Sequence, residues 1–172
     1  MNITVNEIIS EQFTMNLLAL KNIMEKAKAH ATERKFNPDL FLDMKLAPDM
    51  FTFARQVQIA TDNAKGAAAR LSGKTAPVFE DKEKTMDELI ERVGKTLNFL
   101  EGFSEKDFAD AENKKITFPW YPGKFIGGRD YLISHAIPNV YFHLTTAYAL
   151  LRMGGVKIGK VDFLGNQNWQ QA

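Results

Sequence analysis

Residues 131–151, YLISHAIPNVYFHLTTAYALL, contain no Asp, Glu, Lys or Arg, and they constrain the fold more than any other stretch of the chain. On a helix, successive steps of three and four residues place apolar side chains on one face. These side chains are Ile133, Ile137, Val140, Leu144, Ala147 and Leu151. A helix that is apolar on nearly every side is buried on more than one side. We therefore expect other helices to pack around this one.

An uncharged stretch of this length could also cross a bilayer, which takes about 20 apolar residues. Its Pro138, Asn139, two histidines and two threonines disfavour a membrane span. The other helical stretches of the chain are too highly charged to accompany it in lipid. We therefore expect a helix that is buried within protein.

Composition indicates one ordinary globular domain, residues 1–172, with 45% hydrophobic and 25% charged residues. A net charge of +1 gives no attraction to nucleic acid or to an acidic membrane. The absence of cysteine excludes disulfides, zinc–thiolate sites and thiol nucleophiles. The first residues, MNITVNEIISEQF, do not resemble a secretory signal, so we expect a cytoplasmic protein.

Apolar periodicity and capping residues predict four long helices and a short tail. Thr85 and Glu88 form a plausible capping box at the start of the third helix. Pro48 suits the first turn of the second helix. The predicted helices span about residues 4–32, 48–72, 85–101 and 129–153, and the tail spans residues 154–172. We predict an all-α four-helix bundle with a long connection between the third and fourth helices.

The connection between the third and fourth helices contains the sequence ITFPWYPGKFIGG, residues 116–128. Residues that favour strands flank Tyr121-Pro122-Gly123, so this segment predicts a short hairpin or an ordered loop. It brings Trp120 and Tyr121 close to the start of the fourth helix. They could cap one end of the core or form the wall of a binding pocket.

His135, Asn139, His143 and Thr146 form a polar column on the side of the fourth helix opposite its apolar face. Each buried polar group without a partner costs about 1–3 kcal/mol, so this column should face protein or a cavity. Pro138 removes one backbone donor and should disturb the helix beside Asn139.

Three stretches resemble the DinB-like four-helix-bundle superfamily. They are DMKLAPDMFTFARQVQIATDNAKGAAARLSG, PNVYFHLTTAYALLR and the helix end HLTTAYALLRMGG followed by VDFLG. Within this superfamily, the whole chain is similar to a bacterial branch of about this length with no known function. The resemblance implies a four-helix bundle and, commonly, a dimer. Its metal-binding members use one histidine of the second helix and two, four residues apart, of the fourth. Several of them resemble metal-dependent thiol transferases or hydrolases.

The histidine motif of the superfamily falls on Gln56, Asn139 and His143 of this chain, so one imidazole of three is kept. Neutral amide oxygens suit Zn²⁺ or Ni²⁺ poorly. His135 lies eight residues before His143, about 12 Å along a helix, so the two cannot share an ion. We expect no metal and no other cofactor. If Zn²⁺ or Ni²⁺ does bind, His143 would hold it with Asn139 and Gln56.

The sequence therefore favours a DinB-like bundle of uncharacterised function with a small polar pocket. The pocket residues that we expect are Gln56, Asn139, His143, His135, Trp120 and Tyr121. They could bind a small molecule, or form only a satisfied network in the core. The alternatives are a metal-dependent thiol transferase or hydrolase, and metal-free acid–base catalysis by His143 or His135. We expect a homodimer that binds neither nucleic acid nor membrane, and the sequence assigns no catalytic residue.

Overall fold

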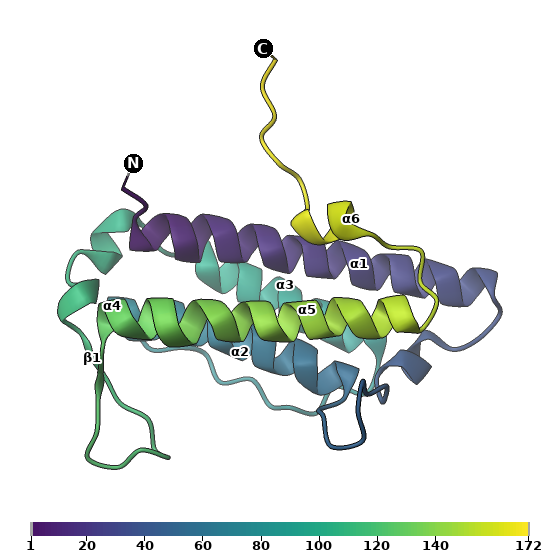
Figure 1. Cartoon of the computed structure of the whole chain (residues 1–172), viewed down its shortest axis with the longest axis horizontal. Helices are drawn as coiled ribbons and strands as arrows, with labels where there is room; N and C mark the ends of the chain where they lie inside the picture. The colour runs from purple at the N-terminus through teal and green to yellow at the C-terminus, as the bar shows by residue number, and fades with distance from the viewer. Residues whose placement is uncertain (1, 172) are drawn as a thin grey trace.

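The computed structural model describes residues 2–171. Met1 and Ala172 lie outside the described residues. Both belong to the predicted domain, and Ala172 also belongs to the predicted tail. Four long helices lie side by side along one axis, and a short hairpin extends from one end of this bundle (Figure 1). The all-α four-helix bundle expected from the sequence is therefore confirmed.

The first long helix begins with a π-helical segment, η1 (Glu7–Phe13), and continues as α1 (Thr14–Glu33). The second and third are α2 (Phe53–Ser72) and α3 (Met86–Leu100). The fourth consists of α4 (Gly128–Tyr131), the π-helical segment η5 (Leu132–Ala136) and α5 (Ile137–Met153). The short elements are η2 (Pro38–Phe41), η3 (Glu105–Phe108), η4 (Ala111–Asn113), β1 (Lys115–Ile116), β2 (Ile126–Gly127) and α6 (Lys160–Leu164).

α2 and α3 each begin at a side-chain cap, and this corrects one predicted boundary. α2 begins at Phe53, five residues after the predicted start at Pro48. Thr52 is its N-cap, and the side-chain oxygen of Thr52 accepts a hydrogen bond from the backbone N–H of Arg55 at 3.3 Å. Proline has no side-chain acceptor for the free N–H groups of a first turn, whereas threonine has one. The capping box predicted for Thr85 and Glu88 is present at the start of α3.

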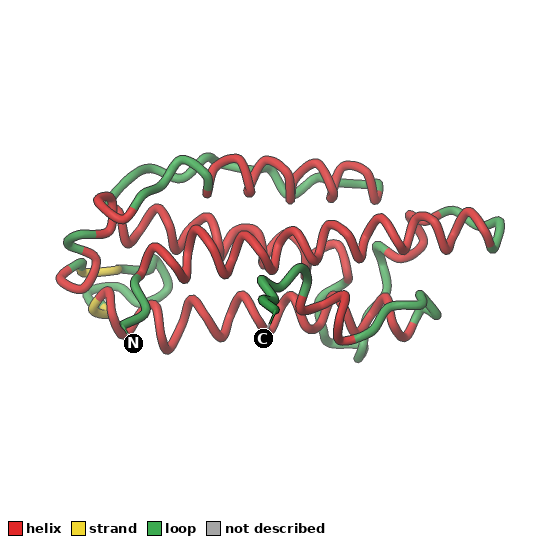
Figure 2. Tube along the Cα trace, turned by 90° about the horizontal axis from the view of Figure 1, so that it is seen from above, coloured by secondary structure: helices red, strands yellow, loops and turns green. Residues whose placement is uncertain are grey.

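α2 and α3 follow each other in sequence but run parallel to each other. Asp62 of α2 contacts Arg92 of α3, and Lys74, after the end of α2, contacts Gly102, after the end of α3. The segment between them, residues 73–85, therefore returns along the bundle, and we call it the crossover segment (Figures 1 and 2). It has no regular secondary structure. An extended chain gains about 3.3 Å per residue, enough to cover the roughly 30 Å of the 20-residue α2. This return along the bundle was not predicted from the sequence.

Arg92 of α3 holds the crossover segment against α2, and only 2% of its side chain is exposed. Its guanidinium forms ion pairs with Asp62 of α2 at 2.9 Å, Asp81 at 3.0 Å and Glu83 at 2.9 Å. Its Nε also donates a hydrogen bond to Thr61 Oγ1 at 2.8 Å. Burial alone would raise the pKa of the Glu83 carboxyl, but hydrogen bonds from Arg92 and Gln58 lower it.

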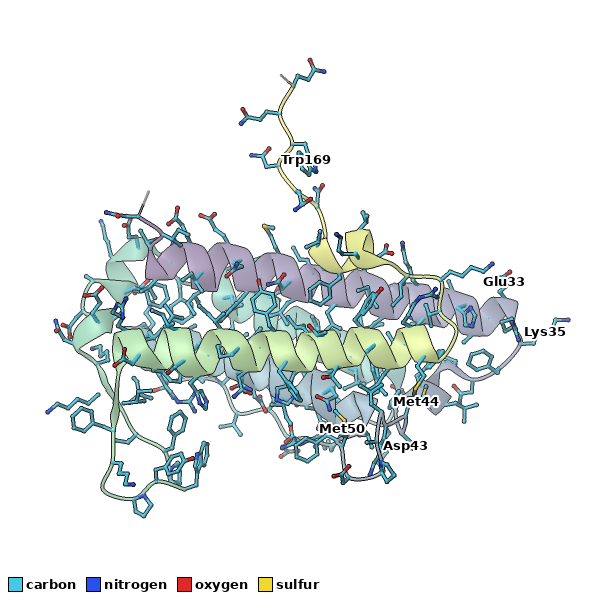
Figure 3. The ribbon with its side chains drawn as sticks, viewed as in Figure 1. Glu33, Lys35, Asp43, Met44, Met50 and Trp169 are labelled. Atoms are coloured by element: carbon cyan, nitrogen blue, oxygen red, sulfur yellow. The ribbon has the colours of Figure 1, made fainter. Side chains whose placement is uncertain are left out.

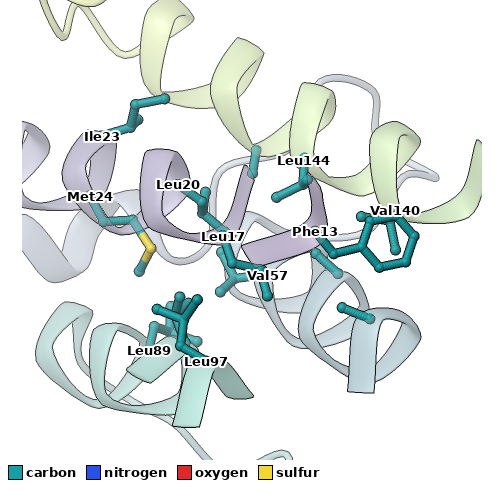
Figure 4. Close-up of a cluster of buried hydrophobic side chains, with 14 of the residues drawn as sticks. Phe13, Leu17, Leu20, Ile23, Met24, Val57, Leu89, Leu97, Val140 and Leu144 are labelled. Atoms are coloured by element: carbon teal, nitrogen blue, oxygen red, sulfur yellow. The ribbon is translucent and has the colours of Figure 1, made fainter. Parts of the chain in front are cut away.

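The core lies between the four long helices, as the side chains in Figure 4 show. The apolar stripes predicted for the first three helices are all buried. From the fourth helix, Val140, Leu144, Ala147 and Leu151 are buried as expected. Ile133 and Phe142 are instead 51% and 55% exposed, so this helix is less enclosed than its composition predicted. It packs mainly against α2 and, less extensively, α1, which leaves its outer side to solvent.

A π-helical segment, η5, ends at Ala136, two residues before Pro138, and α5 continues through the proline. Among residues 2–171, no helix combines the length and the hydropathy that a membrane span requires.

The hairpin predicted before the fourth helix is present. β1 and β2 pair antiparallel, with Lys115 opposite Gly127 and Ile116 opposite Ile126. The tail packs back on the bundle only in part. Val156 and Ile158 are buried, but Val161 and Leu164 are 78% and 40% exposed, because the short α6 turns only one side toward α1. Trp169 stands clear of the bundle (Figure 3).

Candidate functional site

Gln56 of α2 and His143 of α5 meet between the two helices and are both buried. His143 Nδ1 lies 2.6 Å from Gln56 Oε1, within a hydrogen bond. Gln56 Nε2 donates its own hydrogen bond to the backbone oxygen of Phe51, at 3.2 Å. This second contact fixes the orientation of the amide, so that its oxygen points at the imidazole. The two residues that the sequence placed together on different helices are therefore in direct contact.

The contact with Gln56 defines the protonation of His143. An amide oxygen only accepts hydrogen bonds, so Nδ1 carries the proton and Nε2 keeps its lone pair. Burial, and then the positive charge of Arg55, lower the pKa of His143 to about 4. The ring is therefore neutral at pH 7. Nε2 has no hydrogen-bond partner in the described part of the chain, but it is not among the fully buried unpaired atoms. It therefore retains contact with solvent.

Asn139 makes a separate contact. Its Oδ1 accepts a hydrogen bond from Asn63 Nδ2 at 3.1 Å. Asn63 lies seven residues beyond Gln56, about 10 Å along α2, so the Asn139 amide is engaged away from Gln56. Thr146, the last member of the predicted polar column, donates to the backbone oxygen of Phe142 in its own helix. The expected cluster of Gln56, Asn139 and His143 is thus divided into two contacts between α2 and α5.

His135, Trp120 and Tyr121 lie at the hairpin, apart from His143. The His135 ring stacks on Tyr131, with centroids 5.4 Å apart, and contacts Phe118 at 4.9 Å. Trp120 in turn stacks on Phe118, with ring centroids 4.8 Å apart. His135 and Tyr121 line a cavity of about 280 Å³ beside the hairpin. Burial, and then the charge of Arg70, lower the pKa of His135. The six predicted pocket residues therefore belong to two regions.

Comparison with known proteins shows the family of the chain. Residues 6–164 match the model of the family described as a domain of unknown function, DUF1993. The chain belongs to the DUF1993 family. It is also similar to a DinB family member protein from Shewanella denitrificans, whose crystal structure shares 45% sequence identity with it. The alignment covers 98% of this chain and 96% of that one, with a TM-score of 0.94. The resemblance to DinB-like proteins is therefore confirmed, and no curated protein matches the chain significantly.

In this DUF1993 chain, the residues at the expected metal positions do not fit a divalent transition metal. His143 supplies one imidazole, but the Gln56 oxygen already accepts its Nδ1 proton, and the Asn139 oxygen accepts from Asn63. Neutral oxygens are poor ligands for Zn²⁺ or Ni²⁺. Nor do residues 2–171 contain a group of three or more His, Cys, Asp or Glu side chains that could hold an ion.

Sequence reasoning missed Asn63 and Phe51 at this site of the DUF1993 chain. Asn63 shares a face of α2 with Gln56 because it lies two turns further on, and helical spacing alone could have identified it. Phe51 contributes its backbone oxygen from a loop, and no side-chain pattern signals such a contact. The pair formed by Gln56 and His143 can hold a neutral imidazole in one tautomer and present the Nε2 lone pair as a hydrogen-bond acceptor.

Proposed function

We propose that this protein binds a small molecule without a metal, through a hydrogen bond from an O–H or N–H group of the ligand to Nε2 of His143. The 2.6 Å contact between His143 Nδ1 and Gln56 Oε1 carries this proposal. It leaves Nε2 as the only free functional atom of the ring. A low pKa, about 4, keeps that atom an acceptor at neutral pH.

Exposed aromatic side chains next to Gln56 and His143 favour a ligand that has an apolar part. The Phe142 ring meets the His143 ring edge to face, with centroids 5.1 Å apart, and is 55% exposed. Phe51, whose backbone oxygen holds Gln56, is 57% exposed. Binding sites for small molecules commonly combine apolar walls with a few fixed polar groups. A ligand with one donor group and an aromatic ring matches this arrangement.

Nitrogen NMR of protein labelled with ¹⁵N-histidine tests the protonation on which the proposal depends. We expect His143 to show a protonated Nδ1 and an unprotonated Nε2 at pH 7, and to titrate about 2.5 pH units below a free histidine. Added Zn²⁺ or Ni²⁺ should leave both resonances in place. A stoichiometric shift of the His143 resonances would instead support the alternative, a metal-dependent transferase or hydrolase.

Phenol and anisole form a matched pair of probes for the ligand itself, since only phenol has a hydrogen-bond donor. Phenol should shift the Nε2 resonance of His143 saturably, whereas anisole should not. Gln56→Ala should weaken the effect because the tautomer is no longer fixed. Equal responses to both probes, or no response to either, would contradict a donor-binding site at Nε2.

We also propose that the protein forms a homodimer through α1. Met15 and Leu18 of α1 are 42% and 45% exposed, and Leu164 beside them is 40% exposed. Gly165 brings the end of α6 against the Met15 backbone. Light scattering after gel filtration should give twice the chain mass of 19.5 kDa. Leu18→Glu should give the single-chain mass, and a monomeric parent protein would contradict the proposal.

A further inference from the structure

A second, basic cavity lies at the opposite end of α2 from Gln56. It has a volume of about 390 Å³ and lies between the last turns of α2, the start of the crossover segment and β1. Three cationic side chains line it, Arg70, Lys74 and Lys115, and no Asp or Glu is among its lining residues. Arg70 lies fourteen residues after Gln56, about 21 Å along the helix. This cavity is therefore independent of the site proposed above.

Arg70 is the cation that most needs a partner. In the part of the chain that the structure describes, no carboxylate lies within 4 Å of its guanidinium; Lys74, in contrast, pairs with Asp107 at 2.7 Å. Arg70 Nη1 donates a hydrogen bond to the neutral Tyr131 hydroxyl at 3.2 Å, and the guanidinium lies 5.2 Å from the Phe118 ring centroid. Aromatic faces attract a guanidinium but do not neutralise it, so its remaining N–H donors are available to an anion.

A glycine makes room for this arginine. A Cβ atom at Gly66 would lie 2.3 Å from Arg70 Nη1, so the guanidinium folds back over α2 in space that only glycine leaves. Gly73, at the end of α2, has φ +81° and also lines the cavity. Gly66 lies inside α2, where glycine is less favourable than alanine for helix stability by about 1 kcal/mol. Gly66 therefore leaves the space that the Arg70 guanidinium occupies.

We propose that this cavity, hereafter the Arg70 cavity, binds a small organic anion, a carboxylate or a phosphate, with Arg70 as its anchor. The planar guanidinium matches both groups with paired hydrogen bonds. Lys115 adds a second charge, and the structure pairs its Nζ only with the Phe125 ring, at 4.9 Å. Ile116 lines both this cavity and the aromatic cavity that is also lined by Phe118, Phe125 and His135. An anion that carries an apolar or aromatic group fits two adjoining cavities of this character.

Fluorescence of Trp120 provides the test, because Trp120 stacks on Phe118, which itself contacts the Arg70 guanidinium. Trp169→Phe removes the only other tryptophan and makes Trp120 the sole reporter. The probes are benzoate, phenyl phosphate, acetate and inorganic phosphate, with neutral benzamide as the control. We expect a saturable change with benzoate or phenyl phosphate and none with benzamide. The stronger of these two probes identifies the anionic group.

Arg70→Gln should weaken binding about tenfold or more, which corresponds to losing a charge-assisted, paired hydrogen bond. Lys95→Gln, a charge removed from the exposed side of α3, is the matched control and should bind as the parent does. If Arg70→Gln does not fold, Arg70→Lys and Lys115→Gln replace it, and each should weaken binding. Absence of saturable binding up to about 10 mM, well above a weak affinity of about 1 mM, would overturn the proposal. So would unchanged affinity in the Arg70 variants.

Discussion

Replacing Arg92 with methionine should lower the free energy of unfolding at pH 7 by about 3 kcal/mol, the lower end of the cost of leaving a buried ion pair without one partner. The guanidinium is 2% exposed and pairs with Asp62, Asp81 and Glu83. Methionine would leave these three carboxylates facing one another with no common cation. We expect the lower end of the range because Asp62 and Asp81 are about one third exposed and can take up water.

The effect of Arg92→Met should depend on pH in a defined direction. The folded-state pKa of Glu83 is lowered, so its contribution is present above the ordinary glutamate pKa, about 4.3, and is lost as pH falls through the folded value. The parent protein should therefore lose stability in acid. The variant has lost the cation that lowers this pKa. The difference in stability between parent and variant should therefore shrink as the pH falls below about 4.

Urea denaturation followed by far-UV circular dichroism measures both quantities, provided that the transition is two-state. Lys95→Met removes a cation from the exposed side of the same helix, where its partner is Glu91, and should change stability by less than about 0.5 kcal/mol. Equal effects of the two substitutions would contradict the role of Arg92. A difference that does not change with pH would contradict the part assigned to Glu83.

The long helices were predictable because their apolar stripes repeat at helical spacing. Apolar residues at helical spacing in the first three helices are buried, among them Phe13, Val57 and Leu89. The hairpin was also predictable, because turn residues lie between two strand-forming runs. These signals are local, and each depends only on neighbours within a few residues along the chain.

The crossover segment was missed because its contacts are not local. Asp81 and Glu83 look like solvated charges in the sequence, and only the fold brings Arg92 between them. The length of the segment does not reveal its path, because the connection between α1 and α2, residues 34–52, is longer still.

The candidate site was only partly predictable, for the same reason. Resemblance to the DinB-like proteins brought Gln56 and His143 together, and the structure places them in contact. It did not indicate the hydrogen bond between Asn139 and Asn63, because a polar side chain on a helix face has several potential partners. Nor did it indicate Arg70, whose importance depends on the absence of a nearby carboxylate, and that cannot be seen before the fold is known.

Replacing Gly128 with alanine should also destabilise the protein by about 3 kcal/mol, the upper end of the usual cost of overpacking. A Cβ atom at Gly128 would lie 1.8 Å from the backbone oxygen of Ala111 and 2.9 Å from its carbonyl carbon. Both contacts are with backbone, which cannot rotate away as a side chain could. Either η4 or α4 must therefore move. Because α4 leads into Tyr131 and His135, such a movement should also disturb the aromatic group at the hairpin.

Gly127→Ala is a matched control at the adjacent position. No atom lies within 4 Å of the Cβ that it would add, and Gly127 has φ −65°, which alanine adopts without strain. Its stability should match that of the parent or exceed it by up to about 1 kcal/mol, because alanine restricts the unfolded chain. Urea denaturation compares the two variants, and Trp120 fluorescence reports on the hairpin. If Gly128→Ala were as stable as Gly127→Ala, η4 would not pack against α4 as described, and the wall that β1 gives to the Arg70 cavity would lose its support.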